Sequence, residues 1–324
     1  MKQQTFAVAA RFEKFGRQSR RAEFLSAMDR VVPWRELVAL IEPHYPDTGK
    51  GRPPIGVERM LRIYFLQQWF NLSDPGVEDA LYDSLAMRSF VGIDLGREPA
   101  PDETTVCKFR HLLERHGLGQ RIFAEVNGYL DRHGLKIGTG TIVDATLLHA
   151  PSSTRNHSGE RDPEMHQVRK GNQWYFGMKA HVGVDAETKL IHSVEATAAN
   201  VADSRMMGAL LHGNETEVWG DQAYQGQAKV LAERAPRATD RTNRLWRTKL
   251  KVYPERREEN RIQSKTRSRV EHVFATMKLQ FGFVKVRFRG LAKNLHRLQA
   301  TCALVNLCTA RTYLLAVRPP QSRA

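Results

Sequence analysis

Residues 141–148 read TIVDATLL, a short apolar run with a single acidic residue inside it. A run of this length that is rich in Ile, Val and Thr predicts a buried strand. Asp144 lies in the middle, where a carboxylate is unfavourable unless it is paired or bound to a cation. The run therefore predicts a strand and a candidate site on it. An Asp that only hydrogen-bonds to nearby backbone is the alternative that the strand alone leaves open.

Downstream of this strand, further strands alternate with helices. Residues 174–186 and 189–199 are two β-rich runs joined by a turn near 187–189, which predicts a hairpin. This order predicts the α/β class, with a mixed sheet flanked by helices. The other expected elements are a polar loop over 150–171, a strand over 217–220, and helices over 201–211, 227–234, 261–279 and 291–315.

Upstream of residue 135 the apolar spacing is helical. Val57 to Phe70 is the clearest case, and a second helix is expected from Asp74, as N-cap, to about Met87. Short helices with tight turns and scattered Arg are typical of helix-turn-helix DNA readers, although a helical cap on the next domain fits this segment equally well. Two more helices are expected over 103–116 and 118–133. The predicted domains are a helical DNA-binding domain over 1–135, a catalytic core over 136–290, and a C-terminal helix packed on the core, with a tail, over 291–324.

The charge of the chain is concentrated in one segment. The whole chain carries +15, and residues 241–297 hold seventeen Lys or Arg against four acids, which is +13 of that excess. A basic field of this density attracts polyanions, and the stretch FGFVKVRFRG (281–290) adds aromatic residues to it. Nucleic acid is therefore the expected partner. A solvated basic surface is the alternative.

Other compositional features narrow the class of protein. No uninterrupted apolar run reaches the ~18–20 residues that a membrane span needs, so no membrane partner is expected. Residues 1–21 lack the apolar core of a secretory signal. The three cysteines show no C-x-x-C spacing, which fits a reducing cytosol without disulfides or a zinc ribbon. We expect a cytoplasmic protein.

Three acidic residues stand out by their positions. Asp144 lies inside the first strand, Asp221 ends the strand over 217–220, and Glu271 lies on the helix over 261–279. Carboxylates suit two Mg²⁺ ions ~3.5–4 Å apart, which activate a water or a 3′-hydroxyl in phosphodiester transfer. The residues alone thus favour a metal-dependent nuclease or transposase.

Two basic residues share a helix face with the third acid. At about 100° per residue, Arg267, Glu271 and Lys278 fall within roughly 40° of one another. Arg and Lys in such positions hold DNA phosphates. A surface ion pair between residues four apart is the alternative for Arg267 and Glu271.

Several longer blocks of the sequence resemble one family. The chain resembles the DDE transposases of bacterial insertion sequences, most closely the insertion sequence 5 family, over most of its length. The blocks occur in the family's order, which makes the resemblance more specific than any one spacing. They are GVERMLRIYFLQQWFNLSDPGVEDALYDS (56–84), PDETTVCKFRHLLERHGL (101–118), IVDATLLHAPSSTRN (142–156), the central block over 161–203, VWGDQAYQG (218–226) and SRVEHVFATMKLQFGF (268–283).

The resemblance implies a fold and a set of site residues. It implies an RNase H-like core with Asp144, Asp221 and Glu271 as catalytic, metal-binding acids, and Mg²⁺ as cofactor with Mn²⁺ as a substitute. The family signature Tyr-x2-Arg-x3-Glu-x6-Lys is matched by Arg267, Glu271 and Lys278, which are the expected DNA-binding and acidic residues. Ser264 stands at the tyrosine position, so the phosphate or end contact of that tyrosine is not implied here.

The resemblance also implies an activity and partners. A DNA transposase would cleave double-stranded DNA at terminal inverted repeats and transfer the 3′-hydroxyl ends into target DNA. It would act as a homodimer or larger synaptic complex, in the bacterial cytoplasm on the nucleoid. The alternatives are an RNase H-like nuclease without strand transfer, a catalytically silent DNA-binding descendant of a transposase, and a basic structural protein without a DNA role.

Overall fold

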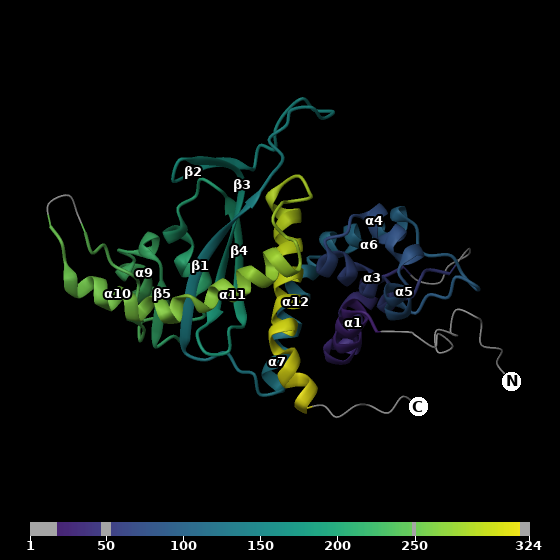
Figure 1. Cartoon of the computed structure of the whole chain (residues 1–324), viewed down its shortest axis with the longest axis horizontal. Coiled ribbons are helices and arrows are strands. Elements are labelled where there is room, and N and C mark those ends of the chain that lie inside the picture. The colour runs from purple at the N-terminus through teal and green to yellow at the C-terminus, as the bar shows by residue number, and fades with distance from the viewer. Residues whose placement is uncertain (1–17, 47–52, 248–250, 318–324) are drawn as a thin grey trace. The chain divides into compact units, whose positions relative to one another are not determined.

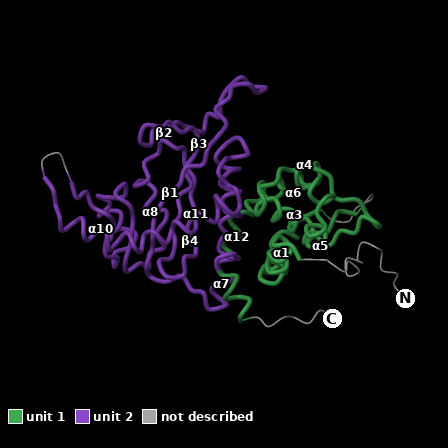
Figure 2. Tube along the Cα trace, in the orientation of Figure 1, with its two compact units in different colours: residues 1–125, 310–324 green, residues 126–309 purple. Residues whose placement is uncertain are grey.

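The computed structural model describes residues 18–46, 53–247 and 251–317. The chain divides into two compact units, one of residues 1–125 with 310–324 and one of residues 126–309 (Figure 2). The expectations that fall on residues 1–17 and 318–324, at the ends of the predicted outer domains, lie outside the described residues.

The first unit is helical. Its interior is aromatic, with the rings of Trp34, Phe65, Trp69 and Phe90 stacked edge to face or tilted against one another. Such clusters bury a large apolar area for few residues. The helices are α1 (Arg20–Val31), α2 (Trp34–Ile41), η2 (Glu42–His44), α3 (Val57–Phe70), α4 (Asp74–Asp83), α5 (Leu85–Val91), α6 (Glu103–Arg115) and the first part of α7 (Leu118–Arg132).

The helix expected from Asp74 to Met87 is two helices, and its predicted cap is wrong. Ser73 is the N-cap of α4, and its hydroxyl accepts from the Gly76 N–H at 3.0 Å. The Asp74 carboxylate pairs instead with Arg110 at 3.0 Å. Ser84 has extended backbone between α4 and α5 and caps the second helix, which ends the first one early.

The second unit is built on a six-stranded mixed sheet (Figure 1). The strands are β1 (Gly140–His149), β2 (His166–Lys170), β3 (Gln173–Asp185), β4 (Ile191–Ala198), β5 (Glu217–Gly220) and β6 (Thr239–Asp240). β1 pairs with β3, and β3 with β4, in antiparallel directions. β5 is parallel to β1, and β6 is parallel to β5. β2 pairs with the first half of β3 and makes a hairpin with it.

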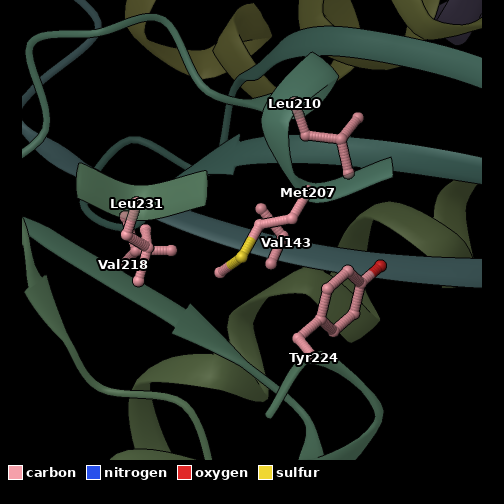
Figure 3. Packing of buried hydrophobic residues seen from close by; sticks show 6 residues of the cluster. All are labelled: Val143, Met207, Leu210, Val218, Tyr224 and Leu231. Carbon is pink, nitrogen blue, oxygen red and sulfur yellow. The ribbon is translucent and has the colours of Figure 1, made fainter. Parts of the chain in front are cut away.

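Helical segments pack on the sheet. Val143, Met207, Leu210, Val218 and Tyr224 form a buried cluster between β1, β5 and the short helices on one face (Figure 3). This cluster sets the position of the loop that follows β5. The helical segments of this unit are η3 (Asp203–Met206), α8 (Met207–Leu210), η4 (Gln222–Tyr224), α9 (Ala228–Arg234), α10 (Pro254–Arg267), α11 (Arg269–Ala275), the π-helical turn η5 (Thr276–Gln280) and most of α12 (Leu291–Val317).

The long helix α12 is held to the start of β4 by an amide side chain. Asn306 is fully buried, and its side chain accepts from the Ile191 N–H at 2.8 Å and donates to the Ile191 carbonyl at 2.7 Å. By length and composition α12 could cross a membrane, but 56% of its most apolar window is buried inside the protein. Core helices of globular proteins meet the same criterion, so the helix is weak evidence for a membrane span.

Three expectations about this unit need correction. β2 lies within the stretch expected to be a polar loop. The sequence does not indicate this strand, because its residues are mostly exposed and lack the apolar alternation of a core strand. The helix expected over 201–211 is only the 3-10 turn η3 and the single turn α8. The helix expected over 261–279 begins earlier, at Pro254, and is divided into α10, α11 and the π-helical turn.

Candidate active site

The sheet brings Asp144 and Asp221 together. β1 and β5 are parallel neighbours whose last pair is Val143 with Gly220, so the next residues on the two strands are Asp144 and Asp221. Asp221 keeps extended backbone, with φ −76° and ψ 178°, and continues the line of β5 for one more residue. Residues far apart in the sequence thus lie side by side, at the end of β5, where sites gather in α/β sheets.

The Asp144 carboxylate is mostly buried and already has two partners. One oxygen accepts from the Ala145 N–H at 2.8 Å, and the other pairs with the Arg267 guanidinium at 3.1 Å. The pKa of Asp144 is raised to about 6: burial raises it most, the Ala145 N–H and Arg267 lower it, and the nearby carboxylates of Asp221 and Asp203 add to the rise. A buried carboxylate beside two other carboxylates favours the entry of a cation.

Asp221 begins the short helix η4. One of its carboxylate oxygens accepts from the Ala223 N–H at 2.9 Å, so the side chain is held in one direction. The loop after β6 packs beside it, because the Asn243 N–H donates to the Gly220 carbonyl at 3.0 Å. The side chain of Asn243 donates to the Ser264 hydroxyl at 3.1 Å. Ser264 therefore anchors α10 to the loop beside Asp221.

Arg267 links the strand acid to the helix acid. It is the last residue of α10, and its second terminal nitrogen lies 3.8 Å from a Glu271 oxygen on α11. The predicted placement of Arg267 and Glu271 on one face is confirmed. The Glu271 side chain is 68% exposed, so it stands at the rim of the site while Asp144 lies inside it.

Lys278 lies apart from the three acids. It is part of the π-helical turn η5, and its ammonium group donates to the Leu147 carbonyl on β1 at 2.8 Å. Burial lowers its pKa, and the neighbouring Lys170 of β2 lowers it further. The turn shifts the helical phase after Ala275, so the ideal-helix angle predicted for Lys278 does not apply. π-helical turns of this kind are frequent at functional sites.

The structure adds an acid that the sequence reasoning missed. Asp203 lies on η3 and forms an ion pair with Lys179 of β3 at 2.7 Å, while the Lys179 ammonium also donates to the Val201 carbonyl at 2.7 Å. Its charge raises the pKa of Asp144, which places it in the same acidic group. No local pattern indicates this role, because the turn that carries Asp203 reaches the site only through the fold.

The donor set suits a hard divalent cation. Asp144, Asp203 and Asp221 offer carboxylate oxygens, and Mg²⁺ prefers such ligands and keeps several of its waters. Within the described part of the chain, no three His, Cys, Asp or Glu side chains are already arranged to hold a metal. The adjacent Asp144 and Asp221 fit a cation as a pair. Glu271 joins them only if it leaves its position beside Arg267.

Comparisons with known proteins agree with the division of the chain. Residues 13–112 match the family described as Transposase domain (DUF772), and residues 136–307 match the family described as Transposase DDE domain. One similar solved structure is that of the piggyBac transposase synaptic complex with hairpin DNA, at 10% sequence identity and a TM-score of 0.46. The similarity covers 90% of this chain and 75% of that one.

Proposed function

Since this chain belongs to the DDE transposase family and is a DNA transposase, we propose that Asp144, Asp221 and Glu271 are its catalytic, metal-binding acids. The observation that carries the proposal is the register of β1 and β5, in which Asp144 and Asp221 are neighbours. Arg267 supports it further, since it links Asp144 to Glu271 at 3.1 and 3.8 Å. Members of this family generally use divalent metal ions.

We propose Mg²⁺, with Mn²⁺ as a substitute, as the cation of this site. The cation would supply an activated nucleophile and stabilise the leaving oxygen. Asp144 and Asp221 would hold it, and Glu271 would close on it from the rim. Arg267, once released from the carboxylates, and Lys278, which contacts the Leu147 carbonyl of β1, would position DNA phosphates.

The reaction that fits these groups is cleavage followed by joining. The chain would cut double-stranded DNA at the terminal inverted repeats of an insertion sequence, and the freed 3′-hydroxyl would attack target DNA. The strand order supports an RNase H-like core: three antiparallel strands, β4, β3 and β1, followed by the parallel β5 and β6. We further propose membership of the insertion sequence 5 family, on the sequence blocks that resemble it.

The remaining parts of the proposal concern partners and place. The helical segment within 1–135 would grip DNA ends, the core over 136–290 would carry the chemistry, and the segment over 291–324 would pack on that core. Two DNA ends need to be held together for joining, so a homodimer or larger synaptic complex is proposed. The basic segment over 241–297 suits a protein that works on the nucleoid in the cytoplasm.

A cleavage and joining assay tests the site. The substrate is a duplex with the element's own terminal inverted repeat, incubated with wild type, Asp144→Asn or Asp221→Asn, with and without Mg²⁺. We expect metal-dependent nicking at the repeat boundary and joined products with wild type, and a loss of at least ~10³-fold with either variant, since each removes a charge from the cation site.

The matched control is Asp240→Asn on β6, whose carboxylate accepts from the Thr242 N–H. This variant should keep wild-type activity. Nicking without joined products supports the alternative of a nuclease without strand transfer. Specific binding without cleavage, in Mn²⁺ as well as Mg²⁺, overturns the proposed site and favours a catalytically silent DNA-binding protein.

A further inference from the structure

Tyr224 is a buried residue whose polar end the fold does not use. It ends the 3-10 turn η4, three residues after Asp221, and its side chain is 1% exposed. One side of its ring packs in the cluster with Val143 and Met207 (Figure 3). Gly220 lies against it as well, since a Cβ at Gly220 would stand 3.1 Å from the Tyr224 Cβ. The ring is thus held in a single position.

The hydroxyl of Tyr224 lies within electrostatic reach of the site acids. It is buried and has no hydrogen-bond partner among the described residues. Burial raises the pKa of Tyr224 strongly, and the charges of Asp203, Asp144 and Asp221 raise it further. All three carboxylates therefore lie within electrostatic reach of this one hydroxyl. Buried tyrosine hydroxyls almost always have a partner, because leaving the donor unmet costs free energy.

The nearest element that carries an acceptor is η3. It packs against η4, and it carries Asp203, whose carboxylate is the largest of the three charges acting on Tyr224. Asp203 is held by Lys179 on one oxygen. A phenolic O–H that faces a carboxylate can only donate to it, since the carboxylate is an acceptor. The Tyr224 hydroxyl, which has no partner among the described residues, can therefore serve as the donor to Asp203.

We propose that Tyr224 is a positioning residue of the acidic site, which donates a hydrogen bond to Asp203 and fixes it as a further carboxylate for the divalent cation. This inference rests on the proposed function, because it needs a cation held by Asp144 and Asp221. Groups that orient ligands in this way commonly change metal affinity by ~10–100-fold when they are removed. If the ring only fills the core, losing the hydroxyl leaves cation binding unchanged.

Tyr224→Phe separates these roles because it removes the hydroxyl and keeps the ring. The full chain is titrated with Mn²⁺ alone by calorimetry, and its melting temperature is measured with and without Mn²⁺. For Tyr224→Phe we expect an unchanged or higher melting temperature without metal, since an unpartnered buried hydroxyl is removed. In the same variant we expect Mn²⁺ affinity to fall by about 10-fold or more.

Three further variants complete the test. Tyr129→Phe removes a hydroxyl from another buried tyrosine, which lies in α7 and packs on His133, and should keep wild-type Mn²⁺ affinity. Asp203→Asn should weaken Mn²⁺ binding about as much as Tyr224→Phe. The double variant of Asp203 and Tyr224 should be no weaker than the worse single one, since groups that act as a unit are not additive.

The outcomes distinguish this inference from the proposed function. If wild type binds no Mn²⁺, or if Asp144→Asn binds it as well as wild type does, the proposed cation site is wrong. If wild type binds Mn²⁺, Asp144→Asn does not, and Tyr224→Phe keeps wild-type affinity, the role of Tyr224 is overturned while the cation site stands. Additive losses in the double variant overturn the pairing of Tyr224 with Asp203.

Discussion

Arg267 is the internal counter-ion of the acidic site. Its guanidinium lies 3.1 Å from Asp144 and 3.8 Å from Glu271. In the absence of a divalent cation, Arg267 therefore neutralises part of the negative charge of these two carboxylates. A cation that binds to Asp144 has to compete with Arg267, and the released guanidinium becomes available for a DNA phosphate.

Because Arg267 and a cation compete for Asp144, the loss of Arg267 should destabilise the metal-free protein and increase the stabilisation that Mg²⁺ gives. Without metal, Arg267→Gln should lower the free energy of unfolding at pH 7 by about 1–2 kcal/mol, because Asp144 loses its counter-ion beside Asp221 and Asp203. Added Mg²⁺ should restore more stability to this variant than it adds to wild type. Urea unfolding in EDTA and in Mg²⁺ measures both effects.

Arg261→Gln is the matched control. This arginine is also on α10, and it pairs with Glu258 in an exposed ion pair, at 61% and 59% side-chain exposure. Its loss should leave stability almost unchanged, with or without Mg²⁺, because solvent screens an exposed ion pair. An Mg²⁺ response of Arg267→Gln equal to that of wild type would show that the arginine and the cation do not compete.

At the residue scale, a site residue can be predicted from the sequence where its charge contrasts with an apolar strand or marks the end of one. Asp144 is detectable as a charge inside an apolar run, and Asp221 as a charge at a strand end. Asp203 and Tyr224 give no such signal, because a short 3-10 turn has no clear periodicity and their neighbours are brought in by the sheet. The catalytic roles of the predicted acids remain predictions until the variants are assayed.

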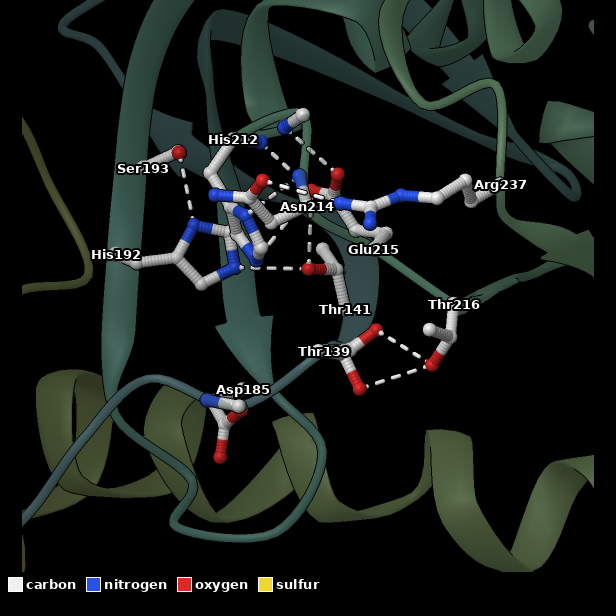
Figure 4. Close-up of polar contacts among 12 residues, drawn as sticks. Thr139, Thr141, Asp185, His192, Ser193, His212, Asn214, Glu215, Thr216 and Arg237 are labelled. Carbon is white, nitrogen blue, oxygen red and sulfur yellow. Dashed lines mark hydrogen bonds and ion pairs between the residues drawn. The ribbon is translucent and has the colours of Figure 1, made fainter.

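At the scale of elements, a cluster of buried polar side chains joins β1 and β4 to the segment before β5 (Figure 4). The hydroxyl of Thr141 lies 3.2 Å from the Nε2 of His192 and donates to the buried Glu215 at 3.3 Å. Glu215 also accepts from the N–H groups of His212 and Gly213 at 2.6 and 2.7 Å. Because this carboxylate accepts hydrogen bonds from three groups, it fixes where β5 begins.

This polar cluster predicts that the folded protein becomes less stable at acidic pH. The pKa of His192 is lowered from 6.5 to about 3, chiefly by burial and also by His212, while Asp185 opposes the shift. Between these values the unfolded chain binds a proton that the folded protein does not, so stability falls as pH falls below 6.5, by up to ~1.4 kcal/mol per pH unit. From pH 7 to 5, wild type should lose about 2 kcal/mol more than His192→Gln in urea unfolding.

His157→Gln controls for the loss of an imidazole as such. His157 lies exposed in the loop between β1 and β2. Its removal should leave the difference in stability between pH 7 and 5 as in wild type. An equal difference in wild type and His192→Gln would show that His192 does not cause the loss of stability in acid.

Elements with a strong period were predictable, and irregular ones were not. The helix over Val57–Phe70 and the hairpin of β3 and β4 are confirmed within a few residues, because apolar spacing follows helix and strand geometry directly. The π-helical turn over 276–280 was not predictable, since one extra residue per turn leaves no mark in an apolar stripe. The ideal-helix angle used for Lys278 therefore does not hold beyond Ala275, and its shared face with Arg267 and Glu271 stays a prediction.

At the scale of the whole molecule, the net charge of +15 predicts salt-dependent binding to any DNA. Each neutralised phosphate contributes about −0.9 to the slope of log affinity against log salt concentration. The variant with Arg244, Arg257 and Lys265 all changed to Gln removes three exposed charges of the basic segment. We expect it to make the slope shallower by about 2–3, as measured by anisotropy on a random-sequence duplex between about 50 and 200 mM salt.

A second triple variant controls for net charge alone. Lys136, Lys229 and Arg234 are exposed residues of the same unit outside the basic segment. Changing all three to Gln lowers the net charge equally and should change the slope by less than ~1. Equal slopes in the two triple variants would show that the basic segment is not the DNA contact.

The change from a helical to an α/β part of the chain was visible in the sequence, because the apolar period changes after Gly134. The way in which the units share helices was not. α7 and α12 each contribute to both compact units, since the division falls after Glu125 and after Thr309. Apolar spacing shows that a helix is buried, but it does not show in which unit. The predicted boundaries at 135 and 290 therefore remain a proposal.

The parallel pairing of β1 with β5 limits where the length of this chain can change during evolution. Hydrogen-bonded neighbours in a sheet lie about 4.7–4.9 Å apart, whatever side chains they carry. Insertions and deletions in the long connection between Asp144 and Asp221 therefore leave the spacing of the two acids intact. A slip of β5 by one residue would instead turn Asp221 to the opposite face. We therefore expect homologous chains to vary in length in the connection between Asp144 and Asp221, but not within the four residues of β5.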